Sequence, residues 1–237
     1  SPYFGKFYSE NATHEALAAY ADDLKVSRVE NTTSHVANFL SNGKVVAWFE
    51  KGSEFGPRAL GHRSILADPR NPEIRDFINK DVKFREDFRP FAPSVPQDKV
   101  SIYFDCEADY ESPYMIQVLQ TRDEWKEKIP AVVHADGSAR VQTVTQKLSP
   151  NYYKLIGEFG DKTGVYVLLN TSFNKKGMPI VETPEQALSF FMECALDVLV
   201  IDGCIIEKKH SKARAKTDER AEWDKGLGAL YSENLGI

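Results

Sequence analysis

The sequence predicts an α/β (α+β) fold, in which a twisted sheet of mixed parallel and antiparallel strands is flanked by helices. Short buried-type runs of β-branched and aromatic residues are interspersed with segments of helical periodicity. Other strand-like runs lie close together around turn residues, as in hairpins, so the sheet is expected to be mixed. With 237 residues, 42% of them hydrophobic, the chain can bury a sizeable core.

Each element in the first half of the chain follows from a local pattern. Apolar residues at helical spacing favour helices, and compact apolar runs favour strands. Asn71 and Pro72 match an N-cap followed by proline at the first helical position, so a helix is expected to begin there. The other predicted elements are helices at 14–24 and 35–40, a strand at 45–49, and strands at 102–104 and 114–119.

The second half of the chain carries the clearest signals. Residues 165–169 form the most strongly apolar run, which predicts a buried strand. Thr183 precedes a proline and a helical stretch, as expected of an N-cap. The other predicted elements are a strand that begins at Arg140, helices at 152–159 and 184–194, and a closing pair of strands at 198–201 and 204–206.

Residues 54–95 contain six of the eleven arginines of the chain, beside glycines, prolines and aromatic residues. A guanidinium group held by rigid neighbours is well suited to bind phosphate or carboxylate. This stretch has eight basic and seven acidic residues, a net charge of +1, and the whole chain carries −5. Nucleic-acid binders present a basic stripe instead, so we expect a small anionic ligand and no nucleic acid.

Other compositional features exclude further classes. The three cysteines show no CxxC spacing, which favours reduced thiols and a cytoplasmic protein. The five histidines are scattered, so we expect no metal site within this chain. No apolar run reaches the roughly 18 residues of a membrane span, and no membrane association is expected. Because Ser1 is neither an initiator methionine nor part of a signal peptide, we expect a fragment or a processed product.

Two glycines, Gly56 and Gly61, flank four residues in a pattern that superficially resembles a phosphate-binding loop. Such a loop needs Lys-Ser/Thr after its second glycine, and His62-Arg63 stands there, so this interpretation fails. The pattern leaves two alternatives for Arg58: a tight turn aims it at a ligand, or it is a structural arginine on a surface turn.

Helix spacing separates the basic residues that follow. Lys80 and Arg85 each have an aspartate four residues earlier, which predicts ordinary surface pairs. Lys83 has no acidic residue four positions earlier, although Glu86, three positions later, is a possible partner. Arg89 lies beyond the helix. Lys83 and Arg89 are therefore the better ligand candidates.

Two later segments supply further candidates. Arg140 begins an alternating strand, where an exposed arginine is the simpler interpretation. The segment 170–174 follows the strongest predicted strand, and the carboxyl ends of strands form sites in α/β sheets. Its amide and hydroxyl groups are expected to bind a ligand, the alternative being a self-capping turn. No histidine base stands nearby in sequence, so binding is preferred to nucleophilic catalysis.

These residues, taken together, resemble the O-carbamoyltransferase family, which includes the nodulation-factor, cephamycin and tobramycin carbamoyltransferases. The resemblance is to the C-terminal, YrdC-like domain of that family and runs from about His35 to about Lys208. The segments that carry it are 54–70, 82–86, 89–95, 134–144, 169–174, 182–188 and 197–201. His62 departs from the family pattern, in which asparagine is expected at this position.

The resemblance implies that this domain forms carbamoyl adenylate from carbamoyl phosphate and ATP, with Mg²⁺ entering with the nucleotide. It implies that an N-terminal domain, absent from this chain, binds Fe or another metal and passes the carbamoyl group to an acceptor hydroxyl. Catalytic roles are implied for Lys83, Arg89 and Arg140, and substrate or nucleotide binding for Ser172. Weaker matches are Arg58 and Asn170, and we expect the adjacent Thr171 and Asn174 to belong to the same binding segment.

We therefore expect three parts: a linker or tail of the missing domain at 1–33, a YrdC-like carbamoyltransferase domain at 34–208, and a C-terminal extension at 209–237. A homodimer is possible. Two alternative functions stay open: formation of threonylcarbamoyl adenylate for tRNA modification, and a nucleotide- or RNA-binding module without catalysis.

Overall fold

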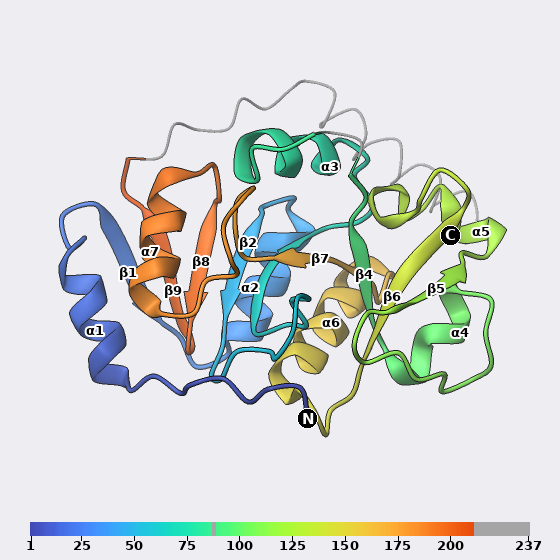
Figure 1. Cartoon of the computed structure of the whole chain (residues 1–237), viewed down its shortest axis with the longest axis horizontal. Coiled ribbons are helices and arrows are strands. Elements are labelled where there is room, and N and C mark those ends of the chain that lie inside the picture. Colours follow the sequence, from blue (N-terminus) through green and yellow to red (C-terminus); the bar gives the residue numbers. More distant parts are fainter. Residues whose placement is uncertain (87–88, 211–237) are drawn as a thin grey trace, which may run out of the picture.

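The structure, a computed structural model, describes residues 1–86 and 89–210. Its strands are β1 (Leu24–Arg28), β2 (Val46–Phe49), β3 (Arg63–Ala67), β4 (Ala92–Pro96), β5 (Gln117–Gln120), β6 (Ser138–Val144), β7 (Leu168–Ser172), β8 (Val198–Ile201) and β9 (Cys204–Lys208). Within the described residues these nine strands form one sheet, in the order β1-β9-β8-β2-β3-β7-β4-β6-β5 (Figure 1). The pairs β2–β8 and β4–β6 are parallel and the others are antiparallel, which confirms the predicted mixed sheet.

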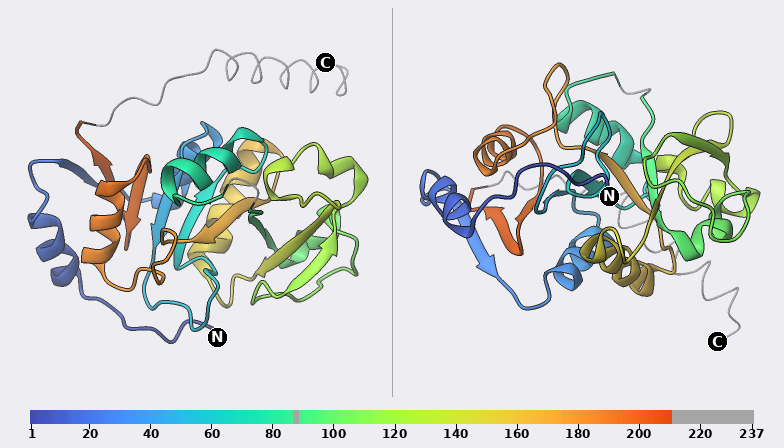
Figure 2. Two further views of the ribbon diagram at one scale, coloured as in Figure 1. Left: turned by 45° about the horizontal axis from the view of Figure 1, so that its top comes forward. Right: turned by 60° about the horizontal axis from the view of Figure 1, so that its bottom comes forward.

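Helices cover both faces of this sheet. The longer ones are α1 (Glu10–Ala18), α2 (Thr32–Ser41), α6 (Pro150–Thr163) and α7 (Pro184–Glu193). The shorter ones are α3 (Glu73–Phe77), α4 (Val100–Tyr103), α5 (Asp123–Lys126), the π-helical turn η1 (Ile78–Val82), and the 3-10 turns η2 (Gln97–Lys99) and η3 (Pro130–Val132). Helices α2 and α6 lie side by side, as Figure 2 shows.

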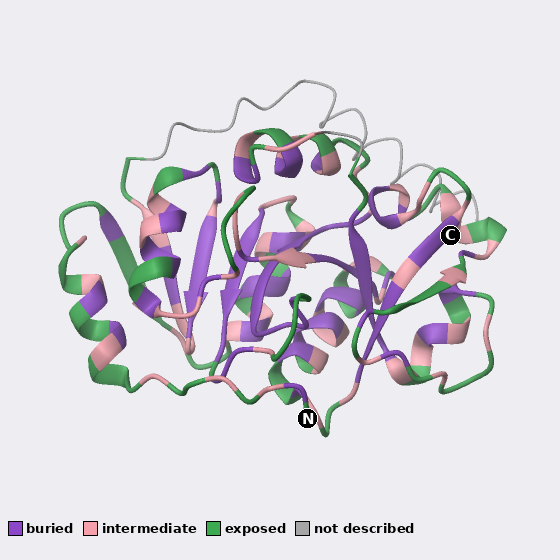
Figure 3. Cartoon of the chain, in the orientation of Figure 1, coloured by how far each residue is buried: buried purple, intermediate pink, exposed green. Residues whose placement is uncertain are grey.

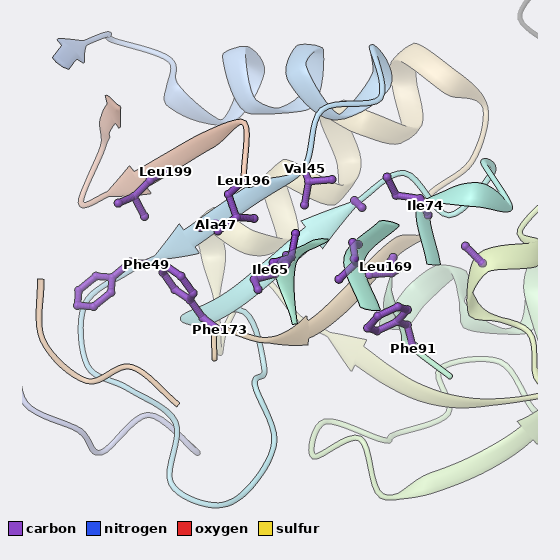
Figure 4. Packing of buried hydrophobic residues seen from close by; sticks show 14 of the residues in the cluster. Val45, Ala47, Phe49, Ile65, Ile74, Phe91, Leu169, Phe173, Leu196 and Leu199 are labelled. Atoms are coloured by element: carbon purple, nitrogen blue, oxygen red, sulfur yellow. The ribbon is translucent and has the colours of Figure 1, made fainter. Parts of the chain in front are cut away.

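The core has two layers because strand side chains alternate between the two faces. On β2, Val46 and Trp48 belong to the cluster packed by α2 and α6. Ala47 and Phe49 belong to the opposite cluster, which includes residues of α1, α3, η1 and α7 (Figure 4). The central strands β2 and β8 are buried along their whole length, whereas β5, at one edge of the sheet, is largely exposed (Figure 3).

Several predicted elements are confirmed. The helices around 35–40, 152–159 and 184–194 are present, as is the closing pair β8–β9. Thr183 caps α7 through a reciprocal pair of hydrogen bonds with Gln186. The side chain of Asn71 accepts a hydrogen bond from the backbone N–H of Glu73, so it caps α3 as predicted.

Other predictions are wrong in type or position. Residues 102–104 were expected to be a strand, but α4 ends at Tyr103, and the buried positions Val100, Tyr103 and Phe104 have helical spacing. The first helix begins at Glu10 and not at His14, because Ser9 caps it. Strands β1, β3 and β4 were missed.

Residues 1–33, expected to be a linker or tail, contain α1 and β1, and β1 pairs antiparallel with β9. Most of the predicted C-terminal extension, from residue 211 onward, lies outside the described residues. None of the described helices is both long and apolar enough to cross a membrane.

Candidate functional site

Several predicted site residues lie near the ends of neighbouring strands, where β7 ends and β4 and β6 begin. Strand β7 occupies 168–172 rather than 165–169, so Asn170 and Ser172 lie within the strand. Asn170 pairs with Ala92 of β4, and Ser94 pairs with Gln142 of β6. Arg140, two residues before Gln142, is therefore level with Ala92, and its Cα lies about 10 Å from that of Asn170 on the same face.

Lys83 follows η1 and extends to the end of β7. It is 1% exposed, and its Nζ donates hydrogen bonds to the carbonyl oxygen of Ser172 at 2.5 Å, to Ser172 Oγ at 3.0 Å and to Asn174 Oδ1 at 2.9 Å. Burial, and secondarily the positive charge of Arg85, holds the pKa of Lys83 well below its usual value. Among the described residues Lys83 forms no ion pair, so an anionic ligand here would stabilise its charged form.

The chain reverses at Phe84, which has a φ of 52° in the left-handed region that bulky residues rarely adopt. This turn separates Lys83 from Arg85, whose Nε donates to Asn79 Oδ1 at 2.7 Å and whose guanidinium lies over the ring of Phe91 at 5.0 Å. The predicted surface pair of Arg85 with the aspartate four residues earlier is therefore wrong, because the turn ends the helical register.

Two further predictions about ion pairs are also corrected. Lys80 is exposed, and the aspartate assigned to it, Asp76, lies 3.7 Å from Arg75 instead. Glu86, considered as a partner for Lys83, instead pairs with Arg89 at 3.2 Å and with Lys176 at 2.6 Å. Arg89 is thus held at the surface, with its side chain 48% exposed.

Arg140 and Arg58 form a second group of cations. Burial, and secondarily the positive charge of Arg58, lowers the pKa of Arg140. Arg140 is half-buried, and its Nε has no hydrogen-bond partner among the described residues. Arg58 is exposed on the loop between β2 and β3. The charge of Arg58 acts on Arg140, and two neighbouring arginines favour an anion as a shared partner.

The polar residues of β7 have different roles: Ser172 contacts Lys83, whereas Asn170 supports the fold. Ser172 Oγ donates to Asn174 Oδ1 at 2.7 Å, so both side chains share the hydrogen bonds of Lys83. Thr171 alternates to the opposite face of the strand. Asn170 is 1% exposed, and its Nδ2 donates to Ser94 Oγ, Gln142 Oε1 and the carbonyl oxygen of Ala59.

The loop 54–61, which carries Arg58, is anchored at both ends. Glu54 Oε1 accepts hydrogen bonds from the backbone N–H groups of Leu60 at 2.7 Å, His62 at 2.7 Å and Arg63 at 3.1 Å. Gly56 and Gly61 have φ angles of 114° and 106°, and a Cβ at Gly61 would lie 2.2 Å from the ring of Tyr152. The two glycines are therefore required by backbone conformation, as the predicted tight turn implies.

Arg63 and His62 support this loop and do not face the site. Arg63 is fully buried on the ring of Phe49, and its terminal nitrogens donate to the carbonyl oxygens of Glu50, Lys51, His62 and Glu182. The His62 ring stacks on Tyr3, with centroids 3.7 Å apart. Burial lowers the pKa of His62 to about 4, so the ring is neutral at pH 7.

A cavity of about 440 Å³ opens between Asn174 and the loop 54–61. Other hollows, between α1 and β1 and at the ends of β2 and β8, contain none of the predicted site residues. Within residues 1–86 and 89–210, no group of three histidine, cysteine, aspartate or glutamate side chains is arranged to hold a metal ion.

The chain is thus an α/β domain with a buried lysine at the end of β7 and arginines on neighbouring elements. The chain belongs to the carbamoyltransferase C-terminus family, whose model matches residues 37–208, and this confirms the predicted family. Nodulation protein NolO of Bradyrhizobium diazoefficiens is 41% identical over 202 residues, which cover 85% of this chain and 37% of that protein. An uncharacterized protein of Synechocystis is 38% identical over 245 residues, covering 92% of this chain and 39% of that protein.

The chain therefore spans less than two fifths of the length of these relatives. Among solved structures, the crystal structure of full-length HypF in its phosphate- and nucleotide-bound form matches with a TM-score of 0.47 at 18% identity. The match covers 78% of this chain and 22% of that one.

Sequence patterns alone missed the supporting residues of the site. Asn79, Ser94 and Gln142 are polar residues on apolar helices and strands, and each is buried. A polar side chain at a core position was the available signal, because such a group is almost always hydrogen-bonded.

Proposed function

We propose that this chain is the part of an O-carbamoyltransferase that forms carbamoyl adenylate from carbamoyl phosphate and ATP. The observation that carries the proposal is the buried Lys83 at the end of β7, which has no ion pair among the described residues. Family membership supports carbamoyl transfer in general. The cations near the ends of β4, β6 and β7 favour two phosphate-bearing substrates.

In this proposal water first converts carbamoyl phosphate into carbamate and phosphate. A carbamate oxygen then forms a bond to the α-phosphorus of ATP, and the bond from that phosphorus to the bridging oxygen of pyrophosphate breaks. Both substrates are anions, so cations must offset their repulsion and stabilise the charge that develops during transfer. Lys83, Arg89 and Arg140 would supply this charge, and Arg58 would add to it at the exposed side.

Ser172 and Asn174 would orient the substrate phosphates through the hydrogen bonds they share with Lys83. Asn170 and Thr171, also predicted as binding residues, would support the site without touching the phosphates: Asn170 is buried. Thr171 lies on the opposite face of β7. Mg²⁺ would enter with ATP, coordinated mainly by phosphate oxygens and water, because the described residues offer no carboxylate cluster for it. Transfer to an acceptor hydroxyl would take place in the metal-binding N-terminal domain of the longer protein.

The test is pyrophosphate release from ATP by the full-length protein, measured with and without carbamoyl phosphate. Release that depends on carbamoyl phosphate, and that falls in Arg89→Ala but persists in Lys80→Ala, is the expected result. Release that depends on threonine and bicarbonate would instead support threonylcarbamoyl adenylate formation. Nucleotide binding without any pyrophosphate release would support a non-catalytic module.

A further inference from the structure

Asn79 is a fully buried amide on the π-helical turn η1, four residues before Lys83. The turn is closed by hydrogen bonds of wider than α-helical spacing, from Lys83 N to the Ile78 carbonyl at 2.8 Å and from Arg85 N to the Asn79 carbonyl at 2.9 Å. Single π-helical turns are rare, and they often occur next to functional sites.

Both ends of the Asn79 amide are used on the segment 83–89. Oδ1 accepts from Arg85 Nε at 2.7 Å, and Nδ2 donates to the carbonyl oxygen of Arg89 at 3.1 Å. One side chain therefore binds both Arg85 and Arg89. A hydrogen bond to a charged group contributes more than a neutral one, and leaving either partner buried and unsatisfied is costly.

The described ion pairs of Arg89 and Glu86 are exposed. Arg89 pairs with Glu86, and Glu86 with Lys176, through side chains that are 37% to 52% exposed. Exposed ion pairs of this kind fix a geometry weakly. The buried contacts described for Arg85 and Arg89 include those of Asn79 and the packing of Arg85 on Phe91, and Lys83 is held separately by Ser172 and Asn174.

We propose that Asn79 is a positioning residue of the anion site, which holds Arg89 beside Arg85 by binding the carbonyl of Arg89 and the guanidinium of Arg85. The inference rests on the proposed function for its kinetic consequence, but the positioning itself is independent of any activity. Asn79 does not touch the substrate. It acts on the placement of Arg89.

The kinetic test uses Asn79→Leu, which removes both hydrogen bonds, and Asn79→Asp, which keeps the acceptor for Arg85 but cannot donate to Arg89. Ile78→Val, in the same buried turn, is the matched control for lost packing. We expect Asn79→Leu to raise the KM for carbamoyl phosphate about 10- to 100-fold. Asn79→Asp should show an intermediate increase, and Ile78→Val little change.

A double-mutant cycle with Arg89→Ala separates positioning from general destabilisation. If Asn79 acts through Arg89, Asn79→Leu should lower kcat/KM by no more than about 3-fold in the Arg89→Ala background, because coupled residues are not additive. A full additive loss in that background would overturn the proposal.

A second measurement needs no substrate. In the wild type the Arg85 Nε–H and the backbone amide of Arg85 should exchange slowly with solvent, and Asn79→Leu should speed their exchange at least 10-fold over Ile78→Val. Equal exchange in the two variants would overturn the proposal. If the wild type releases no carbamoyl-phosphate-dependent pyrophosphate, the proposed function fails, and the exchange comparison still decides the role of Asn79.

Discussion

The loop 54–61 and the segment 83–89 both carry arginines that we predict to bind the ligand, but the two regions are held in different ways. The first is fixed by one carboxylate that accepts three backbone hydrogen bonds, and by the amides of Asn170 and Gln142, which bind the carbonyls of Ala59 and Leu60. The second starts from a buried lysine that binds Ser172 and Asn174, and the buried amide of Asn79 binds Arg85 and Arg89. The comparison indicates that the first is a preformed wall and that the second contributes most of the buried charge.

The largest effect is expected from Lys83→Ala, which breaks the segment 83–89 at its charged end. Pyrophosphate release should fall about 10²- to 10³-fold, because a preorganised buried charge is lost. Lys80→Ala, at an exposed position of the preceding turn, should retain nearly full activity. Wild-type rates in a folded Lys83→Ala protein, checked by circular dichroism, would contradict the assignment.

Arg140→Ala should follow, with kcat/KM lowered about 10- to 100-fold. Its side chain is half-buried and close enough to Arg58 for that charge to act on it, so an anion binding there should lose a major contact. Arg28→Ala, at an exposed ion pair on the distant edge strand β1, is the matched control. Equal losses in both variants would mean that Arg140 is no more than a surface charge.

Glu54→Ala tests the anchoring of the loop 54–61. Three backbone amides would lose their shared acceptor, so the free energy of unfolding should fall by about 2–3 kcal/mol. Chemical denaturation measures this loss. The exposed Glu73 on α3 provides the control, and Glu73→Ala should change stability by about 0.5 kcal/mol or less. If both variants unfold alike, the carboxylate does not hold the loop.

The smallest effect concerns His62 at the end of this loop. Its pKa is lowered to about 4 in the fold, so below pH 6.5 the unfolded chain binds a proton more readily than the folded one. The contribution of His62 to the free energy of unfolding is therefore fully present above pH 6.5 and is lost as the pH falls towards 4. The loss between pH 7 and pH 5 should be about 1–2 kcal/mol.

The comparison is made by unfolding the wild type and His62→Gln at each pH. The variant should show a flatter dependence, and His14→Gln, at an exposed position of α1, should follow the wild type. A pH dependence unchanged by His62→Gln would show that other groups dominate this range.

Sequence patterns predicted the class of sheet and most of the elements that carry a strong apolar signature. They failed where tertiary contacts override local preference: Arg63 and Ser64 begin a fully buried strand, because a guanidinium stacked on Phe49 can use backbone carbonyls as partners. Helical spacing likewise misassigned Arg85, since the left-handed conformation of Phe84 cannot be deduced from the residue type.

For the site, sequence reasoning identified Lys83, Arg89, Arg140 and Ser172, and the structure brings Lys83 into contact with Ser172. Their roles stay predictions. Residues that only hold others in place, such as Asn79 and Gln142, were not found, because their partners lie on separate strands or beyond a turn and no local spacing links them.

The position of β7 has a consequence for biosynthesis. This strand is made late, yet it pairs with both β3 and β4 and so closes the middle of the sheet. Pairings so distant in sequence form slowly, since a long loop must be closed before they contribute. A nascent chain that has not yet released residue 172 from the ribosome therefore has no acceptors for Lys83. Until the last third of the domain is synthesised, the side chain of Lys83 stays in contact with water. During this interval the incomplete sheet is exposed to misfolding.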